Sequence, residues 1–172
     1  YLKNASVQVT KLSGKEFSPL FWRLLEKPDF YYDTDPSTKA SLTVKKLAGE
    51  KVMLEFMHAL QNAFFVEGQN VMQSNTLASL AEPFGISNSD FLNFYISEEC
   101  LNLTKQEYAD VKQLGIQGFP ALLYLKDRQG YQLASGYSNL ESLRKALGWV
   151  ENECKQAELS NGNACTDKGC DI

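Results

Sequence analysis

The side chains in this sequence that could carry thiol chemistry are four cysteines, Cys100, Cys154, Cys165 and Cys170. Disulfide exchange needs a reactive thiolate and a second thiol that resolves the mixed disulfide, and a Cys-x-x-Cys pair supplies both. The sequence has no such pair. Four cysteines allow three complete pairings, and their spacing does not choose among them. We therefore expect no catalytic cysteine in this chain and leave the pairing of Cys154, Cys165 and Cys170 open.

A metal centre and an acid–base centre are poorly supported. The segment CTDKGC at residues 165–170 offers two thiols, but the single histidine, His58, lies far away in sequence, so a zinc site lacks ligands. We interpret His58 as a packing residue, because no serine, cysteine or carboxylate partner has an identifiable spacing. Cys100 follows Glu98 and Glu99, whose negative charges disfavour a thiolate, and no helix N-terminus is expected there.

A proline just before a predicted strand is the third feature of the sequence that could serve a chemical function. In the stretch LGIQGFPALLYLK, Pro120 precedes an apolar run, residues 122–125, that is typical of a buried strand. Because proline lacks a backbone N–H, it belongs at the first residue of a strand, at an edge or at a bulge. The residues alone favour an ordinary trans proline, since only about 5–6% of X–Pro bonds in folded proteins are cis.

Residues 1–114 show helical apolar spacing almost throughout. One helix is expected with Asp35 as N-cap, Pro36 at the first helical position and Gly49 at its end. The helix that follows, EKVMLEFMHALQNAFFVEG, has apolar residues on much of its circumference. One predicted stripe is Met53, Met57, Leu60 and Phe64, and the stripe beside it is Val52, Phe56, Ala59 and Ala63. A helix with this much apolar surface must pack on several sides. We therefore predict a helical insertion subdomain over residues 1–114.

After residue 114 the pattern changes to a hairpin and one more helix. The segments PALLYLKD and YQLASGY flank a turn expected at Gln129 and Gly130. The next segment, SNLESLRKALGWVENEC, has an N-cap at Ser138 or Asn139. Its predicted buried stripe is Leu140, Leu143, Leu147 and Val150. We assign residues 115–155 to this second part and residues 156–172 to a polar, flexible tail.

Composition argues against two classes of partner. The formal net charge is −4 and the isoelectric point is near 5.1, with Lys and Arg scattered along the chain, unlike a nucleic-acid-binding surface. No apolar run is long enough to span a bilayer, and the first residues, YLKNASVQVT, lack the features of a signal peptide. We expect no nucleic acid and no membrane partner, and a location in the bacterial cytoplasm.

Several segments, in the right order, resemble one known family. LGIQGFPALLYLKDRQGYQLASGY is similar to the cis-proline loop and following hairpin of DsbA-family thiol–disulfide oxidoreductases. FYYDTDPSTKAS and FMHALQNAFFVEGQNV resemble the helical insertion of the FrnE-like group, which is described as predicted protein disulfide isomerases. The resemblance runs from about residue 1 to residue 150. It implies a mostly helical α/β protein with a thioredoxin-like fold of DsbA type and a helical insertion.

The resemblance also implies a substrate-binding site. In such a family the proline bond is cis, so that the preceding residue offers its backbone to an extended substrate as a strand partner. The proline ring packs against the active-site disulfide, and the missing N–H leaves the sulfur pair undisturbed. Gly118, Phe119 and Pro120 would then bind the substrate, a protein or peptide thiol or disulfide, without a cofactor or a metal.

One departure from the family is large. Its members carry their Cys-x-x-Cys at the start of the first helix, directly after the first strand, and this sequence has neither. The chain opens on Tyr1 in the middle of a pattern. We therefore expect it to be the C-terminal portion of a longer oxidoreductase whose first strand, active-site helix and second strand lie outside it. On its own the chain is expected to be inactive.

Two other functions stay open at this point. Kappa-type glutathione transferases and hydroxychromene carboxylate isomerases use the same fold and bind glutathione beside the equivalent proline, with serine or a similar residue in place of the missing cysteine. A non-catalytic helical interaction module with a vestigial hairpin would use no thiol chemistry in any form of the protein.

Association is expected through the hairpin. If two strands and a helix lie outside the chain, strand 121–126 lacks a partner on one side. An apolar face would then be bare, with Leu122, Tyr124, Leu143 and Leu147 on it. An exposed strand edge beside apolar surface promotes pairing with another chain. We expect either a homodimer through the hairpin or a missing segment that stays bound without a covalent link.

Overall fold

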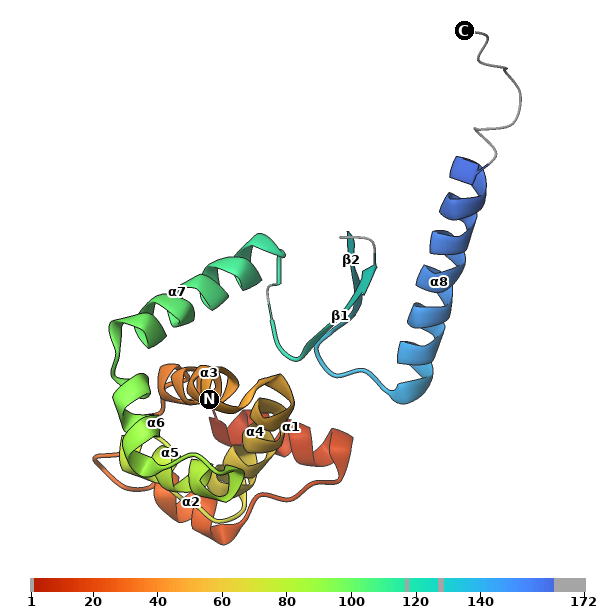
Figure 1. Cartoon of the computed structure of the whole chain (residues 1–172). Helices are drawn as coiled ribbons and strands as arrows, with labels where there is room; N and C mark the ends of the chain where they lie inside the picture. Colours follow the sequence, from red (N-terminus) through yellow and green to blue (C-terminus); the bar gives the residue numbers. More distant parts are fainter. Residues whose placement is uncertain (1, 117, 127–128, 163–172) are drawn as a thin grey trace, which may run out of the picture. The chain divides into compact units, whose positions relative to one another are not determined.

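Helices dominate the part of the chain that the computed structural model describes, residues 2–116, 118–126 and 129–162 (Figure 1). The elements are α1 (Leu2–Ser13), α2 (Pro19–Leu25), α3 (Asp35–Ala48), α4 (Glu50–Phe65), α5 (Ser74–Ala81), the 3-10 helix η1 (Glu82–Phe84), α6 (Asn88–Tyr95), α7 (Glu98–Gln113), β1 (Ala121–Lys126), β2 (Gln129–Ser135) and α8 (Leu140–Gly162). None of the described helices is long and apolar enough to cross a membrane.

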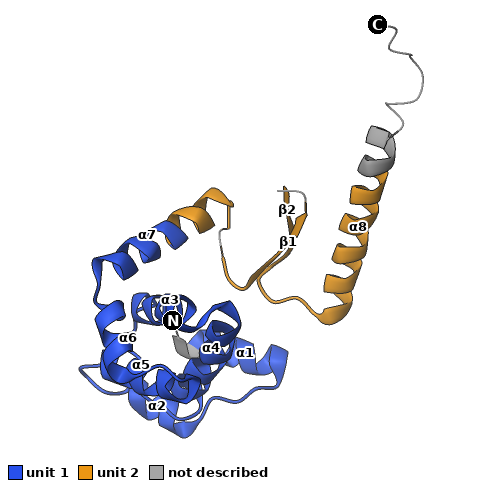
Figure 2. Cartoon of the chain, viewed as in Figure 1, with its two compact units in different colours: residues 1–107 blue, residues 108–172 orange. Residues whose placement is uncertain are grey.

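The chain divides into two compact units, unit 1 (residues 1–107) and unit 2 (residues 108–172) (Figure 2). Every element described between residues 2 and 116 is a helix, which confirms the predicted helical region. The mostly helical α/β class is also confirmed, because the hairpin and α8 follow these helices. The domain limits at residues 114 and 155 stay our proposal. Helix α8 continues into the expected tail as far as Gly162, and residues 163–172 lie outside the described part of the chain.

Helix α3 begins one position earlier than the sequence suggested. Thr34, not Asp35, is the N-cap residue, so Asp35 is the first helical residue and Pro36 follows it. The backbone N–H of Asp35 donates to the carboxylate of Asp33 at 3.0 Å. This bond satisfies one of the N–H groups that a helix start leaves without a partner. Gly49 ends α3 as predicted, with a φ of 92° that favours glycine.

The core of unit 1 is aromatic and joins α2 to α4. Phe21 and Phe64 are fully buried, and their rings meet edge to face with centroids 5.2 Å apart. Tyr32, from the connection between α2 and α3, stacks on Phe64 at 5.2 Å. Phe56 is also buried, whereas Met57, which we predicted on the buried stripe, is exposed. The buried face of α4 therefore combines Leu60 and Phe64 of the first predicted stripe with Phe56 and Ala63 of the second.

A small buried contact joins α3 to the first half of α7. Thr43 and Cys100 are both fully buried, with Oγ1 and Sγ 3.7 Å apart. The Thr43 hydroxyl also donates to the carbonyl of Lys39 at 2.8 Å. At the surface, the Lys46 ammonium and the Glu99 carboxylate are 2.6 Å apart. Because exposed ion pairs contribute little to stability, the buried pair contributes more to this contact than the surface ion pair does.

The strands of unit 2 form an antiparallel hairpin with an irregularity between Leu122 and Leu123. The turn predicted at Gln129 and Gly130 is wrong, because both residues lie in β2 and pair with Lys126 and residue 125. Residues 127 and 128 lie outside the described part of the chain. Glycine in a sequence often indicates a turn, but strands also tolerate glycine. Here the hydrogen-bonded ladder includes Gly130 and continues to Gln129, next to the chain reversal.

Gly68 lets the connection between α4 and α5 approach α2 closely. Its φ is +65°, and a Cβ at this position would lie 2.5 Å from the backbone carbonyl carbon of Leu20. Gly85 has a similar φ of +79°, but a Cβ there would meet nothing within 4 Å. A comparison of substitutions at the two glycines therefore distinguishes the cost of backbone strain from the cost of steric overlap.

We predict that Gly68→Ala destabilises the protein more than Gly85→Ala. Both substitutions place alanine in the left-handed region, which costs about 1–2 kcal/mol. Only at Gly68 does the new methyl group also collide with backbone atoms, which adds about 1–3 kcal/mol. The free energy of unfolding, measured by urea denaturation and circular dichroism, should show this difference. Equal losses would mean that the connection moves away from Leu20 at little cost.

Tyr95 at the end of α6 is a buried phenol. Its ring stacks on Phe91 at 5.6 Å, and the Lys39 ammonium lies 4.4 Å from its centroid. Burial raises the pKa of Tyr95, and the nearby Cys100 and Asp35 raise it further. The folded protein thus favours the neutral phenol more than the unfolded chain does. This contribution to stability is complete below the unfolded pKa and is lost as pH rises through the folded pKa.

We therefore expect the free energy of unfolding to fall as pH rises above about 10, and to fall less steeply in Tyr95→Phe. Urea denaturation at several alkaline pH values measures both slopes. Titration of tyrosinate absorbance in the folded protein measures the ionisation of the phenol independently. If wild type and Tyr95→Phe lose stability in parallel, the buried phenol does not contribute to the alkaline transition.

Candidate functional site

The entrance of the hairpin is the candidate site. The Phe119–Pro120 peptide bond is cis, as the resemblance predicted. The carbonyl oxygen of Pro120 accepts a hydrogen bond from the backbone N–H of Gly136 at 2.7 Å, which extends the ladder beyond the pair Ala121 and Ser135. Gly136 was not among the predicted site residues, although a glycine at the end of an expected strand is a signal for such a position. Its φ of 80° favours glycine.

The three predicted substrate-binding residues lie at the surface. The side chain of Phe119 is 76% exposed, which is unusual for so large an apolar group. Pro120 is also exposed, and Gly118 is half-buried. A Cβ added at Gly118 would meet nothing within 4 Å. Gly118, Phe119 and Pro120 therefore form a short apolar strip that a peptide can reach.

The outer edge of β1 carries backbone groups that face away from β2. In an antiparallel ladder, successive residues direct their N–H and C=O groups alternately to the two sides of a strand. Since the carbonyl of Pro120 points toward β2, the backbone groups of Ala121, Leu123 and Leu125 point to the outer side. In the described ranges, β1 pairs with no strand except β2. Among the described residues, this outer edge carries backbone groups without a strand partner.

Helix α8 covers one face of the hairpin. Val150 and Cys154 of α8 are buried. The burial of Val150 confirms its place on the predicted buried stripe. A hydrogen bond with Cys154 raises the pKa of Tyr131 in β2, and burial and the charge of Glu153 raise it further, while Lys126 opposes the shift. Helix α8 thus packs against β2, and the Tyr131 hydroxyl also donates to Gln129 at 2.7 Å. The sequence offered no signal that Tyr131 and Cys154 meet, because they lie in different elements.

Two expectations about apolar surface need correction. Leu140, predicted on the buried stripe of the last helix, is 61% exposed, because it is the first residue of α8 and has no turn before it. Tyr124, predicted on a bare face, is half-buried and pairs with Tyr131 on the side of α8. Leu122 is 46% exposed, as that prediction required. The larger exposure is on the opposite face, where Leu125 is 72% exposed.

The described cysteines are not placed for disulfide exchange. Cys100 lies in the first turn of α7, contrary to our expectation, and its backbone N–H donates to the Ser97 hydroxyl at 3.1 Å. Its side chain is fully buried, so no substrate disulfide reaches the sulfur in the folded protein. Cys154 is buried as well, and both are free thiols. Cys165 and Cys170 lie outside the described residues.

His58 is exposed on α4, so its interpretation as a packing residue is wrong. The apolar residues on either side of it in sequence turn toward other faces of the helix. In the described part of the chain, no three His, Cys, Asp or Glu side chains gather where they could hold a metal ion.

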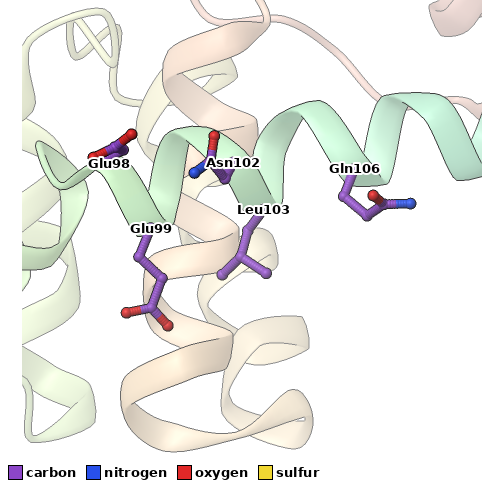
Figure 3. A pocket seen from close by; sticks show the side chains of 5 residues that line it. All are labelled: Glu98, Glu99, Asn102, Leu103 and Gln106. Atoms are coloured by element: carbon purple, nitrogen blue, oxygen red, sulfur yellow. The ribbon is translucent and has the colours of Figure 1, made fainter.

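Two surface hollows lie in unit 1. One has a volume of about 550 Å³ and is lined by side chains of α7 alone: Glu98, Glu99, Asn102, Leu103 and Gln106 (Figure 3). The figure shows these side chains spread along one helix rather than converging on a point. The other, of about 400 Å³, lies between α1 and α2, with Phe17 and Trp22 in its lining. Neither hollow collects a nucleophile with a base, so the hairpin entrance remains the best candidate.

Known proteins similar to this chain share its fold. The structure of a candidate protein disulfide isomerase from Nitrosomonas europaea is 34% identical, with a TM-score of 0.74, over 84% of this chain and 70% of that one. The cytosolic disulfide reductase DsbM from Pseudomonas aeruginosa is 22% identical, with a TM-score of 0.67, over 89% of this chain and 73% of that one. Its structure with GSH is 21% identical, with a TM-score of 0.68, over 87% and 73%. No curated protein matches the sequence.

The matched family is the DSBA-like thioredoxin domain, over residues 26–148. This range contains most of the helical region, the strip Gly118, Phe119 and Pro120, and both strands. The predicted family and thioredoxin-like fold are thereby confirmed. The chain belongs to the family of DSBA-like thioredoxin domains, whose members include thiol–disulfide oxidoreductases.

Proposed function

We propose that this chain is the substrate-binding, C-terminal portion of a DsbA-like thiol–disulfide oxidoreductase or isomerase. The observation that carries the proposal is the family match across the cis-proline segment and its hairpin, where Phe119 is largely exposed. The substrates would be protein or peptide thiols and disulfides. The similar protein DsbM is a cytosolic disulfide reductase, which supports this substrate class and a location in the bacterial cytoplasm.

Gly118, Phe119 and Pro120 would hold the substrate. The exposed ring of Phe119 offers apolar area to a substrate side chain. Next to it, the backbone N–H and C=O groups of Phe119 would pair with the backbone of an extended peptide, as the family resemblance implies. Backbone pairing would provide affinity for many sequences, and the aromatic contact would favour substrates with an apolar residue beside the reacting sulfur.

The reacting thiols would come from sequence outside these 172 residues. In the proposed reaction, a thiolate of a Cys-x-x-Cys pair attacks a substrate disulfide, a mixed disulfide forms, and one substrate sulfur leaves as a thiolate. The second thiol of the pair then breaks the mixed disulfide and releases the reduced substrate. The pair becomes oxidised and the substrate gains two electrons. This chain has no Cys-x-x-Cys pair, and its described cysteines are buried.

We expect Phe119→Ala to weaken peptide binding by about tenfold, because the substitution removes most of the exposed apolar area of the strip. The probe is the insulin B chain with alkylated cysteines, labelled for fluorescence anisotropy, so that no thiol reaction contributes. Leu140→Ala is the matched control, since Leu140 is similarly exposed in unit 2 but lies at the start of α8. If both substitutions have the same effect, or neither has one, the strip does not bind the substrate.

We also expect the chain alone to show no turnover in insulin reduction or in refolding of scrambled ribonuclease. Its most closely spaced pair, Cys165 and Cys170, lies in a polar segment whose sequence indicates no helix start that could stabilise a thiolate. Activity above background that disappears in Cys165→Ser would overturn this expectation. The native gene product, in turn, should contain a Cys-x-x-Cys pair. A native product without one would exclude the proposed reaction.

A further inference from the structure

Tyr137 lies at the same end of the hairpin as Phe119. The backbone N–H of Gly136 donates to the carbonyl oxygen of Pro120 at 2.7 Å. Phe119 directly precedes this bonded pair in one segment, and Tyr137 directly follows it in the other. Ala121 pairs with residue 135, and the same register, continued past the bonded pair, places Tyr137 opposite Phe119. Residues at opposite positions of an antiparallel ladder are near enough for large side chains to interact.

Both aromatic side chains reach the solvent. Phe119 is 76% exposed and Tyr137 is 57% exposed. The other aromatic residues in the ranges 118–126 and 129–140 are Tyr124 and Tyr131, and both are half-buried. The exposed aromatic surface of the hairpin is therefore concentrated at its entrance, beside the strip Gly118, Phe119 and Pro120.

The backbone on both sides of Tyr137 is held in place. On one side, Gly136 is bonded to Pro120 and has a φ of 80°, which favours glycine. On the other side, the side-chain oxygen of Asn139 accepts a hydrogen bond from the backbone N–H of Ser142 at 2.9 Å and so caps the start of α8. An aromatic side chain on a fixed backbone loses little conformational entropy when it binds a ligand.

We propose that Tyr137 is a specificity-determining residue of the peptide site and that it binds, together with Phe119, one aromatic side chain of the substrate. This inference rests on the proposed function, in which the strip holds an extended peptide. The substrates it selects are peptides with Phe, Tyr or Trp beside the reacting cysteine. Two rings offer an aromatic side chain edge-to-face or offset contacts on two sides, whereas a smaller side chain fills less of the space between them.

The charge of the neighbouring sequence fits an apolar ligand. Residues 114–120 and 129–140, the two segments that meet at the entrance, contain no charged side chain. Selection by these segments therefore depends on apolar contact and on backbone hydrogen bonds, which salt screens much less than it screens exposed charges. The preference for an aromatic side chain should accordingly be the same at low and at high salt.

The test uses three labelled peptides that differ only in the residue beside an alkylated cysteine, which is Phe, Leu or Ala. Fluorescence anisotropy should show the Phe peptide binding about tenfold more tightly than the Ala peptide. Tyr137→Ala should reduce this ratio to about twofold or less, and Tyr137→Phe should keep it, because the ring makes the contact. Tyr31→Ala is the control, since Tyr31 is a 78% exposed aromatic residue of unit 1. Circular dichroism checks that each variant is folded.

A double variant tests whether the two rings bind the same side chain. If they do, Phe119→Ala combined with Tyr137→Ala should lose little more of the Phe-to-Ala ratio than Tyr137→Ala alone, because one ring without the other selects weakly. Two independent contacts would instead give losses that multiply, which would contradict a shared site.

The results distinguish this inference from the proposed function. If Phe119→Ala weakens binding and Tyr137→Ala leaves the preference intact, the role of Tyr137 is wrong and the peptide site stands. If Tyr137→Ala weakens all three peptides equally, Tyr137 does not determine specificity. If the wild-type chain binds none of the peptides, the peptide site itself is wrong, and the inference fails with it.

Discussion

The packing of Phe64 against Phe21 is the interaction on which the helical unit depends. Helix α2 is short, and a helix of this length is not stable alone in water. Its place is determined by Phe21, whose ring also contacts Phe65 at 5.5 Å and Trp22 at 4.9 Å. Tyr32 covers Phe64 from the connection to α3. The aromatic rings thus hold together segments that share few backbone hydrogen bonds, and the close approach at Gly68 follows from the same packing.

Unit 2 is built on a different principle. Its hairpin has one face against α8 and one outer edge that no described strand covers. A two-stranded hairpin is marginally stable by itself, so the packing of α8 against β2 contributes to its stability. The surface that remains open is therefore rich in backbone donors and acceptors and in apolar side chains.

Sequence periodicity predicted the helices of unit 1 well, because apolar residues three and four apart identify a buried face. It did not settle which side of that face lies deepest: Met57 and Phe56 are neighbours, and only the aromatic packing buries Phe56 rather than Met57. His58 was misplaced for the same reason. The cis bond at Pro120 was predicted from family resemblance, since local residues favoured trans. Tyr131 and Cys154 come close to each other through tertiary packing, for which the sequence has no local signal.

The limit between the two units lies within α7, and this position affects how the protein unfolds locally. Hydrogen bonds run along this helix from Glu98 to Gln113, across the limit between the two units at residue 107. The first half is held to α3 through Thr43 and Cys100, and the second half has no comparable buried anchor among the described residues. Amide exchange should therefore slow along one helix from its C-terminal to its N-terminal half. Because helix formation is cooperative, melting of unit 2 would propagate into unit 1 only as far as this anchor.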